Sequence, residues 1–259
     1  MITIMDDGKK GYAKNMRLFH NKVKQQLIEN SVYLTKGKRL LDIGCGRGGD
    51  LFKWDNAKLE FVYGYDPNVS YIDEAKRRFN NASNVKRNYV FSTVPFSGFE
   101  NYFDVISCQF AIHYMFATDE ILSNHLDYVS RMLKPGGLYI GTFMDGDRVL
   151  EKLQHNDCFT NQAMCIRRKR EDLTDTGNSL SVHLTGTLYF GEQSVSHEFI
   201  VRKEVFERRC KEHGLRVVRF TPFLEYNKHM NFRMGTDFSE CSYLYTSFVI
   251  EKPLKEGSH

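Results

Sequence analysis

The stretch Leu40–Asp50, which reads LLDIGCGRGGD, decides the fold predicted for this chain. It begins as a short apolar strand and continues into glycines at 44 and 46, which allow a tight backbone turn and the close approach of a ligand. A helix predicted over 47–55 would point its N-terminal amides at that ligand. Gly44, Gly46 and Gly49 also fit the dinucleotide fingerprint GxGxxG, so the turn alone leaves a dehydrogenase open.

Strands and helices alternate on both sides of this turn. We expect strands at 38–43, 60–65, 88–92, 103–108 and 137–143, and helices at 14–30, 69–80 and 118–133. This alternation predicts a parallel, doubly wound sheet in an α/β protein.

The pattern changes after residue 145. Alternate β-branched and aromatic residues around Gly191-Glu192 predict an inserted antiparallel hairpin over 181–201. A helix at 202–213 and strands near 215–223 and 243–251 follow, which would complete a seven-stranded, mostly parallel sheet. We therefore expect one domain over 1–259. Its parts are an N-terminal helix at 14–30, a core at 38–145, an insertion at about 175–201 and C-terminal antiparallel strands at 215–252.

Composition excludes several classes of protein. The 259 residues suffice for one α/β domain, and no apolar run approaches the roughly 18 residues that span a bilayer. The six cysteines are scattered without a CxxC pair, which argues against zinc and disulfides. We expect an intracellular protein with no metal and no membrane contact. The net charge of +4 permits a polyanionic partner, but the basic runs Lys76–Arg78 and Arg167–Arg170 would equally suit solvated surfaces.

Two acids near the glycine turn favour one cofactor class. Asp42 precedes Gly44 by two residues, where a carboxylate can meet an ammonium group and would repel a pyrophosphate. Asp66 ends the next predicted strand, where an acid can accept ribose hydroxyls, although NAD-binding proteins share that feature. Asp104 fits a structural role at a strand start better than a ligand contact.

Two further segments carry a resemblance. Phe103–Ser107 and Leu133–Gly137 are similar to the fourth-strand and pre-fifth-strand motifs of the Rossmann-like class I methyltransferases, which use S-adenosylmethionine. The resemblance implies that cofactor in place of NAD.

The segment Gln109–Phe116, QFAIHYMF, follows the fourth predicted strand, at the sheet edge where α/β proteins bind ligands. Its aromatic side chains can stack on a planar base, although His113 and Tyr114 would also suit capping and core packing. This segment and Leu41–Trp54 resemble the mRNA cap guanine-N7 methyltransferases of eukaryotes and large DNA viruses. Those enzymes carry the patterns QFxxHYxF and LDxGCGxGGDLxK(W/Y), and the resemblance extends from about residue 14 to 252.

This resemblance implies methyl transfer from S-adenosylmethionine to guanine N7 of a GpppN cap, with S-adenosylhomocysteine as product. The transfer would be a direct in-line displacement without a general base, because that nitrogen has no proton to lose. The residues implied to hold the cofactor are Asn21, Lys24, Asp42, Gly44, Gly46, Asp66, Ser92 and Gln109.

The same resemblance assigns residues to the cap. Arg47 and Arg78 would lie near the triphosphate, and His113 and Tyr114 around the guanine. The remaining positions are Glu198, which would accept the N–H groups of the guanine Watson–Crick edge, Tyr245, which would close the pocket, and Tyr189 or Phe190, one of which would pack on the cap.

The chain departs from the family pattern at three places. Tyr89–Val94 lacks the acid expected near the adenine, which is why Ser92 enters as a substitute. Lys22 replaces a tryptophan of the N-terminal motif, and His20 replaces an asparagine.

Two other functions stay open at this point: methylation of a small molecule, and an inactive methyltransferase-like regulatory subunit. The expected partners are a capped RNA 5′ end and the triphosphatase and guanylyltransferase domains of a longer capping enzyme. The expected location is the nucleus for a cellular protein, and the host cytoplasm or the virion for a viral one.

Overall fold

The computed structural model describes residues 7–82, 88–154, 156–168, 172–185 and 195–254. Its main sheet has the strand order β10-β11-β5-β4-β1-β2-β3, in which β11 runs in the direction opposite to the other six strands. The predicted seven-stranded, mostly parallel sheet is therefore confirmed. Its strands are β1 (Arg39–Ile43), β2 (Phe61–Tyr65), β3 (Asn88–Ser92), β4 (Phe103–Gln109), β5 (Leu133–Met144), β10 (Arg216–Pro222) and β11 (Tyr245–Glu251).

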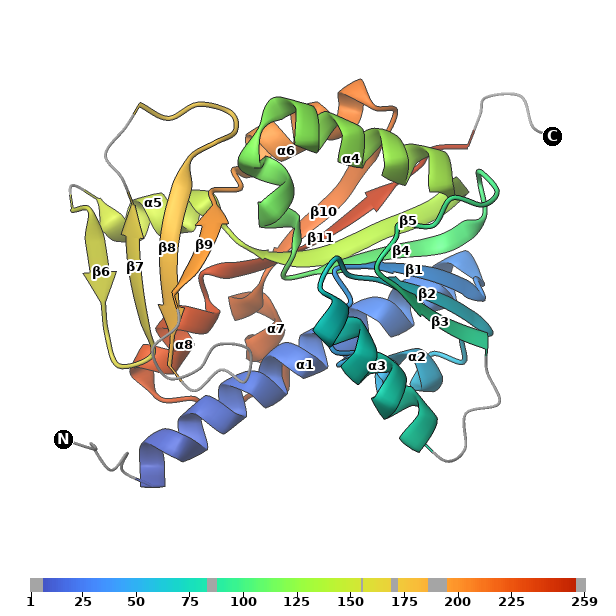
Figure 1. The fold of residues 1–259 in the computed structure, drawn as a ribbon. Helices are drawn as coiled ribbons and strands as arrows, with labels where there is room; N and C mark the ends of the chain where they lie inside the picture. The colour runs from blue at the N-terminus through green and yellow to red at the C-terminus, as the bar shows by residue number, and fades with distance from the viewer. Residues whose placement is uncertain (1–6, 83–87, 155, 169–171, 186–194, 255–259) are drawn as a thin grey trace.

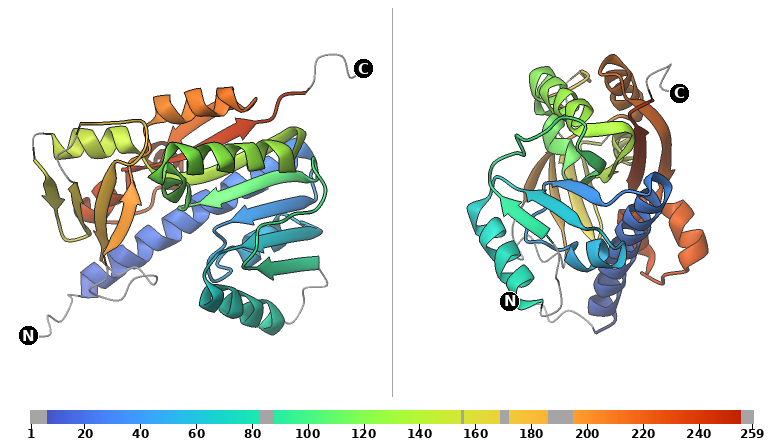
Figure 2. Two further views of the ribbon diagram at one scale, coloured as in Figure 1. Left: turned by 45° about the horizontal axis from the view of Figure 1, so that its top comes forward. Right: turned by 90° about the vertical axis from the view of Figure 1, so that its right-hand side faces the viewer.

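Helices cover both faces of this sheet, as in a doubly wound fold (Figures 1 and 2). One face carries α1 (Asp7–Thr35), α2 (Leu51–Asn56) and α3 (Val69–Asn81), and the other carries α4 (Asp119–Met132) and α6 (Lys203–Glu212). A short 3₁₀ helix, η1 (Ile112–Ala117), links β4 to α4.

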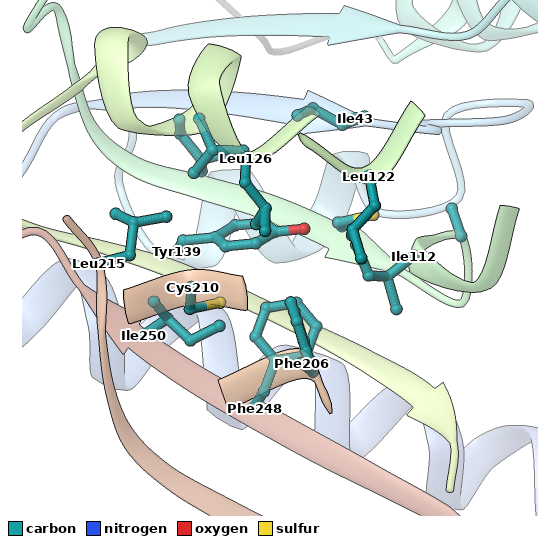
Figure 3. Close-up of a cluster of buried hydrophobic side chains, with 14 of the residues drawn as sticks. Ile43, Ile112, Leu122, Leu126, Tyr139, Phe206, Cys210, Leu215, Phe248 and Ile250 are labelled. Atoms are coloured by element: carbon teal, nitrogen blue, oxygen red, sulfur yellow. The ribbon is translucent and has the colours of Figure 1, made fainter. Parts of the chain in front are cut away.

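The largest apolar cluster lies between the sheet and the helices α4 and α6. Tyr139 of β5 is fully buried there, beside Leu126, Phe206 and Phe248 (Figure 3). Its hydroxyl lies 2.9 Å from Nε2 of His125, which satisfies a polar group that burial would otherwise penalise. This packing fixes the strands whose carboxyl ends carry the candidate site.

The long helix α1 joins two parts of the molecule. Its apolar positions Met16, Phe19, Val23, Leu27 and Ile28 are all buried, as predicted from their helical spacing. Leu27 and Ile28 pack under the main sheet, whereas Met16 and Phe19 pack in the cluster that contains the small sheet. The helix is longer at both ends than the predicted 14–30.

A second, antiparallel sheet stands beside the main one (Figure 1). The predicted hairpin is confirmed as β8 paired with β9, with Leu180 opposite Glu198. Its turn at Gly191-Glu192, together with Tyr189 and Phe190, lies outside the described residues. The small sheet starts at Cys158, so the inserted segment begins before the predicted boundary at about residue 175. The strands of this sheet are β6 (Cys158–Thr160), β7 (Met164–Arg168), β8 (Ser179–Leu184) and β9 (Ser196–Phe199), and α5 (Gly146–Leu153) precedes them.

Two other sequence expectations need correction. The helix after the glycine turn begins at Leu51, not at 47, because Gly44, Gly46 and Gly48 all have positive φ and the backbone is still turning there. Two short helices, α7 (Phe223–Met230) and α8 (Thr236–Ser242), lie where none was predicted. Of the helices described, none combines the length and the apolar composition that crossing a bilayer requires.

Candidate active site

Most of the predicted site residues lie at one edge of the main sheet, next to the small sheet, whereas Arg78 lies apart from them on α3. The parallel strands β1, β2 and β4 end at one edge of the main sheet. Tyr245, the first residue of antiparallel β11, reaches the same edge opposite Met144 of β5. The 3₁₀ helix η1 at the end of β4 contacts β9 of the small sheet. Residues from distant parts of the chain therefore border one region.

The glycine turn is held in place by Asp66. The backbone N–H of Gly46 donates to Oδ2 of Asp66 at 3.0 Å, and that of Asn68 donates to Oδ1 at 2.9 Å. Gly44 has a φ of +75°, and a Cβ added to it would lie 2.7 Å from Cβ of Ala111. Only glycine fits this position without strain or displacement of its neighbour.

Charged side chains gather beside this turn. The Nζ atoms of Lys24 and Lys53 both lie 2.7 Å from Oδ1 of Asp50. Burial opposes ionisation of Asp50, but the two ammonium groups outweigh it and lower its pKa to about 2. Burial and the charge of Asp50 raise the pKa of Asp42 to about 8, against smaller opposing effects of Ser107 and the lysines. The surroundings therefore favour the ionised form of Asp50 and the protonated form of Asp42.

This cluster suits a ligand that carries both an ammonium group and a carboxylate. The buried carboxyl group of Asp42 can accept from an ammonium, and Lys24 brings a positive charge for a carboxylate to the same place. Lys53 donates to the side-chain oxygen of Asn21 at 2.8 Å and to the backbone oxygen of Gly49 at 3.2 Å, in addition to Asp50, so its three N–H groups are engaged within the protein. Sequence reasoning assigned no role to Asp50 and Lys53, although their spacing of three residues across a helix start indicates an ion pair.

Two other predicted cofactor residues are engaged within the protein. Gln109 is buried, donates to Oγ of Ser107 at 3.3 Å and accepts from Oγ1 of Thr142 at 3.1 Å. Ser92 lies at the end of β3 and accepts from the backbone of Val94. Asp104 binds backbone N–H groups at the opposite, amino end of the strands, in agreement with the structural role expected for it.

Aromatic rings form a wall beside Lys24. Phe110 has a φ of +56°, which is uncommon for a residue other than glycine and is a strain that proteins retain at functional sites. Its ring stacks on His20 at 5.6 Å, and Tyr245 packs edge-on against both rings at 5.3 Å. Burial, followed by the charge of Lys24, lowers the pKa of His20 to about 3. A neutral imidazole therefore replaces the asparagine of the family pattern.

On the other side of this region, His113 and Tyr114 of η1 face Glu198 of β9. His113 and Glu198 are buried, with 3.9 Å between Nδ1 and Oε2. Burial lowers the pKa of His113, although Glu198 opposes it. Nε2 of His113 is buried without a hydrogen-bond partner among the described residues. Tyr114 is 45% exposed, with its ring 4.1 Å from that of His113, so it presents a surface on which a planar ligand could stack.

The two arginines assigned to the triphosphate have different surroundings. The guanidinium of Arg47 lies 4.8 Å from the ring centre of Tyr71, with no ion pair among the residues that the structure describes. Arg78 is paired with Glu74 at 2.7 Å on an exposed stretch of α3, and Arg77 is bound to the same carboxylate. Arg47 therefore contacts Tyr71 and Arg78 contacts Glu74, and the structure does not bring the two arginines to one common partner.

Comparison with known proteins identifies relatives by sequence. The pattern of the mRNA (guanine-N(7))-methyltransferase domain matches residues 5–240. The mRNA cap guanine-N(7) methyltransferase 1 of Arabidopsis thaliana is 29% identical over 92% of this chain and 75% of its own length. The mRNA cap guanine-N(7) methyltransferase of Caenorhabditis elegans is 36% identical over 58% of this chain and 45% of its own length. The protein of Acanthamoeba polyphaga mimivirus named "Probable mRNA-capping enzyme" is 28% identical over 85% of this chain and 22% of its own length.

Comparison of structures extends to more distant proteins. The CcbJ methyltransferase of Streptomyces caelestis has a TM-score of 0.60 at 13% identity, over 88% of this chain and 90% of its own. An S-adenosylmethionine-dependent methyltransferase of Clostridium acetobutylicum has a TM-score of 0.55 at 16% identity, over 98% of this chain and 95% of its own. These similarities confirm the predicted fold, that of the Rossmann-like, S-adenosylmethionine-dependent methyltransferases of class I.

Proposed function

Since this chain belongs to the mRNA (guanine-N7)-methyltransferase domain family, we propose that it methylates guanine N7 of the 5′ cap of RNA, with S-adenosylmethionine as donor. The observation that carries the proposal is the buried pair His113 and Glu198 beside the glycine turn. A buried carboxylate accepts two N–H donors readily, and guanine presents such a pair on its Watson–Crick edge whereas adenine does not. An unpaired imidazole nitrogen beside it provides a further polar contact for a ligand.

The charged cluster fits the methionine end of the donor. Asp42 would accept from its ammonium group, and Lys24, assisted by Lys53, would hold its carboxylate. Asp66 would accept the ribose hydroxyls in addition to its backbone bonds, because each carboxylate oxygen has more than one lone pair. When bound, the donor supplies a methyl group on a positively charged sulfur. Ser92, Gln109 and Asn21 would complete the surroundings of the cofactor.

The contribution of the protein to the reaction is mainly positional. Guanine N7 attacks with a lone pair and loses no proton, so no side chain needs to act as a base. Alignment of donor and acceptor can supply roughly 7–11 kcal/mol of the barrier. Glu198 also favours the positive charge that develops on the guanine ring. Tyr114 would stack on the base, and Tyr245 with Phe110 would close the side of the pocket next to Lys24.

The substrate implies other activities upstream. A GpppN end is made by removing the terminal phosphate of an RNA and then transferring a guanylyl group to it. We therefore propose that triphosphatase and guanylyltransferase activities, in the same polypeptide or in separate partners, supply the acceptor. The mimivirus relative is several times longer than the part matched by this chain, which is consistent with the first arrangement.

The decisive experiment uses donor with a labelled methyl group. The chain is incubated with RNA that begins in GpppG, and the RNA is then digested to identify the labelled nucleoside. We expect 7-methylguanosine from capped RNA and no label on the same RNA with a 5′ triphosphate. A cap built on 7-deazaguanosine keeps the Watson–Crick edge but has no acceptor nitrogen, so it should stay unlabelled. Label on ribose, on an internal base or on the deaza cap would refute the proposal.

A further inference from the structure

We propose that Tyr71 is a positioning residue, which holds Arg47 in the orientation that binds the triphosphate bridge of the cap. This inference rests on the proposed function and adds a residue to which sequence reasoning gave no role. The guanidinium of Arg47 lies over the ring of Tyr71, 4.8 Å from the ring centre, within the range of a cation–π contact.

The surroundings of Arg47 distinguish it from its neighbours on α3. Arg77 and Arg78 both pair with Glu74, so each already has a carboxylate partner. Arg47 has no carboxylate partner within the described ranges, and a neutral ring orients it instead. A guanidinium that stacks by its face keeps its N–H edge free, and that edge is what binds phosphate oxygens in pairs. Tyr71 thus orients the cation without neutralising it.

A closed series of contacts fixes Tyr71 relative to Arg47. Gly46, the residue before Arg47, donates its backbone N–H to Asp66 at 3.0 Å. The same carboxylate accepts from the backbone of Asn68 at 2.9 Å, and the side chain of Asn68 caps α3 by accepting from the backbone N–H of Tyr71 at 3.2 Å. The turn and the helix start are therefore tied together through one buried acid.

The location of this pair suits the path of the cap. Tyr71 and Arg47 are both half-buried, so a ligand can reach them. A Cβ added to Gly44, three residues before Arg47, would lie 2.7 Å from Ala111, and Ala111 directly precedes η1, which carries Tyr114. A guanine held between Tyr114 and Glu198 would therefore lie next to the glycine turn that carries Arg47. The phosphates attached to the ribose of that guanosine would supply an anionic partner for Arg47.

The test compares two substitutions of similar size. Tyr71→Leu removes the aromatic face, whereas Tyr71→Phe keeps it and removes only the hydroxyl. With GpppA as acceptor, we expect Tyr71→Leu to raise KM by about two- to ten-fold. The value of kcat and the dissociation constant of S-adenosylhomocysteine should change by less than about twofold. Tyr71→Phe should match the wild type, and so should Tyr33→Leu, which changes a tyrosine that is 82% exposed on α1.

A double variant distinguishes positioning from a general structural effect. If Tyr71 acts through Arg47, then Arg47→Ala with Tyr71→Leu should have the same KM as Arg47→Ala alone. The inference would be overturned if the increase in KM of the double variant equalled the product of the increases in the two single variants. An unchanged KM in Tyr71→Leu would also overturn it. If Tyr71→Leu loses cofactor binding through misfolding, Tyr71→Met replaces it as the non-aromatic variant. A wild-type chain that leaves GpppA unmodified refutes the proposed function instead, so the two failures are distinguishable.

Discussion

His113 on the main sheet side and Glu198 on the small sheet approach to 3.9 Å between Nδ1 and Oε2, and both are buried. This distance is too long for a hydrogen bond, so neither group satisfies the other. Each is therefore available to a ligand that enters between the two sheets. The pair also links η1 to β9, so its spacing depends on how the small sheet packs on the main one.

Glu198→Gln should lower kcat/KM for capped RNA by about 10- to 100-fold, the usual effect of losing a hydrogen bond to a charged group. The amide keeps the size of the side chain but offers only one oxygen and no charge to the guanine edge. Steady-state kinetics would measure this loss in kcat/KM with two acceptors: GpppG, and a cap built on inosine, which lacks the exocyclic amine. Discrimination between the two caps should shrink in the variant. Cofactor affinity should stay within about twofold, and an equal loss of activity and of cofactor binding would contradict this role.

Asp50→Asn should destabilise the fold, because it leaves the ammonium groups of Lys24 and Lys53 buried without a counter-charge. Breaking such a buried pair costs about 3–5 kcal/mol. The folded-state pKa of Asp50 is lowered from 3.8 to about 2, so its contribution is present above pH 3.8 and is lost as the pH falls toward 2. Urea unfolding at several pH values should show the gap between wild type and variant narrowing in acid. Glu74→Gln removes an exposed partner of two arginines and is the control, with little change expected.

Cofactor binding should release a proton through Asp42. Its pKa is raised to about 8 by burial and the charge of Asp50, so the group is mostly protonated at pH 7 before the ligand arrives. An ammonium group next to it favours the ionised form, and affinity should therefore rise with pH up to about 8. Calorimetry at pH 7 in two buffers of different ionisation enthalpy measures the released proton. Asp42→Asn should abolish the difference between buffers; a difference that persists in this variant would assign the proton to another group.

Asp42 also affects the stability of the fold, and the pH dependence of its contribution is opposite to that of Asp50. The folded-state pKa of Asp42 lies above its ordinary value of 3.8. Its favourable contribution is therefore complete below pH 3.8 and is lost as the pH rises through about 8. In the absence of ligand, Asp42→Asn should be more stable than the wild type above pH 8, as measured by urea unfolding. A variant that is less stable than the wild type at that pH would show that ionised Asp42 stabilises the fold.

Alanine at two positions of the glycine turn should have unequal effects. Gly44 has a φ of +75°, and an added Cβ would meet Ala111 at 2.7 Å, so Gly44→Ala combines backbone strain with overpacking. We expect a loss of about 2–4 kcal/mol in the free energy of unfolding. Gly46 has a φ of +53° with no atom within 4 Å of an added Cβ, so Gly46→Ala should cost about 1 kcal/mol. Equal destabilisation in urea titrations would contradict the contact with Ala111.

The main sheet could be predicted because its strands are short apolar blocks between clear turns. Asn88–Ser92 is found where the sequence placed it, and the other parallel strands differ by a few residues at their ends. The small sheet was harder to predict. Its strands β6 and β7 are only three and five residues long, which is too short for an alternating apolar pattern to distinguish them from a loop.

The candidate site divides in the same way. Asp42 and Asp66 were predictable because parallel strands bring their carboxyl ends to one edge, whatever the rest of the chain does. Asp50 and Lys53 lie within the predicted turn and helix start, but their role depends on Lys24, which approaches only because α1 folds back beneath the sheet. The role of Tyr71 was likewise not predictable, since its contact with Arg47 joins the first turn of α3 to the glycine turn, which are separate in sequence.

The sequence by itself determined the layered α/β fold, the glycine turn and the acids at the strand ends, because these depend on local periodicity and on the backbone freedom of glycine. Only the tertiary structure decided which acid has its pKa raised and which lowered, which arginine lacks a carboxylate partner among the described residues, and how far His113 stands from Glu198. These properties depend on burial and on distances between side chains that are remote in the chain. Both are set by the packing of α1 and the small sheet, which no local pattern encodes.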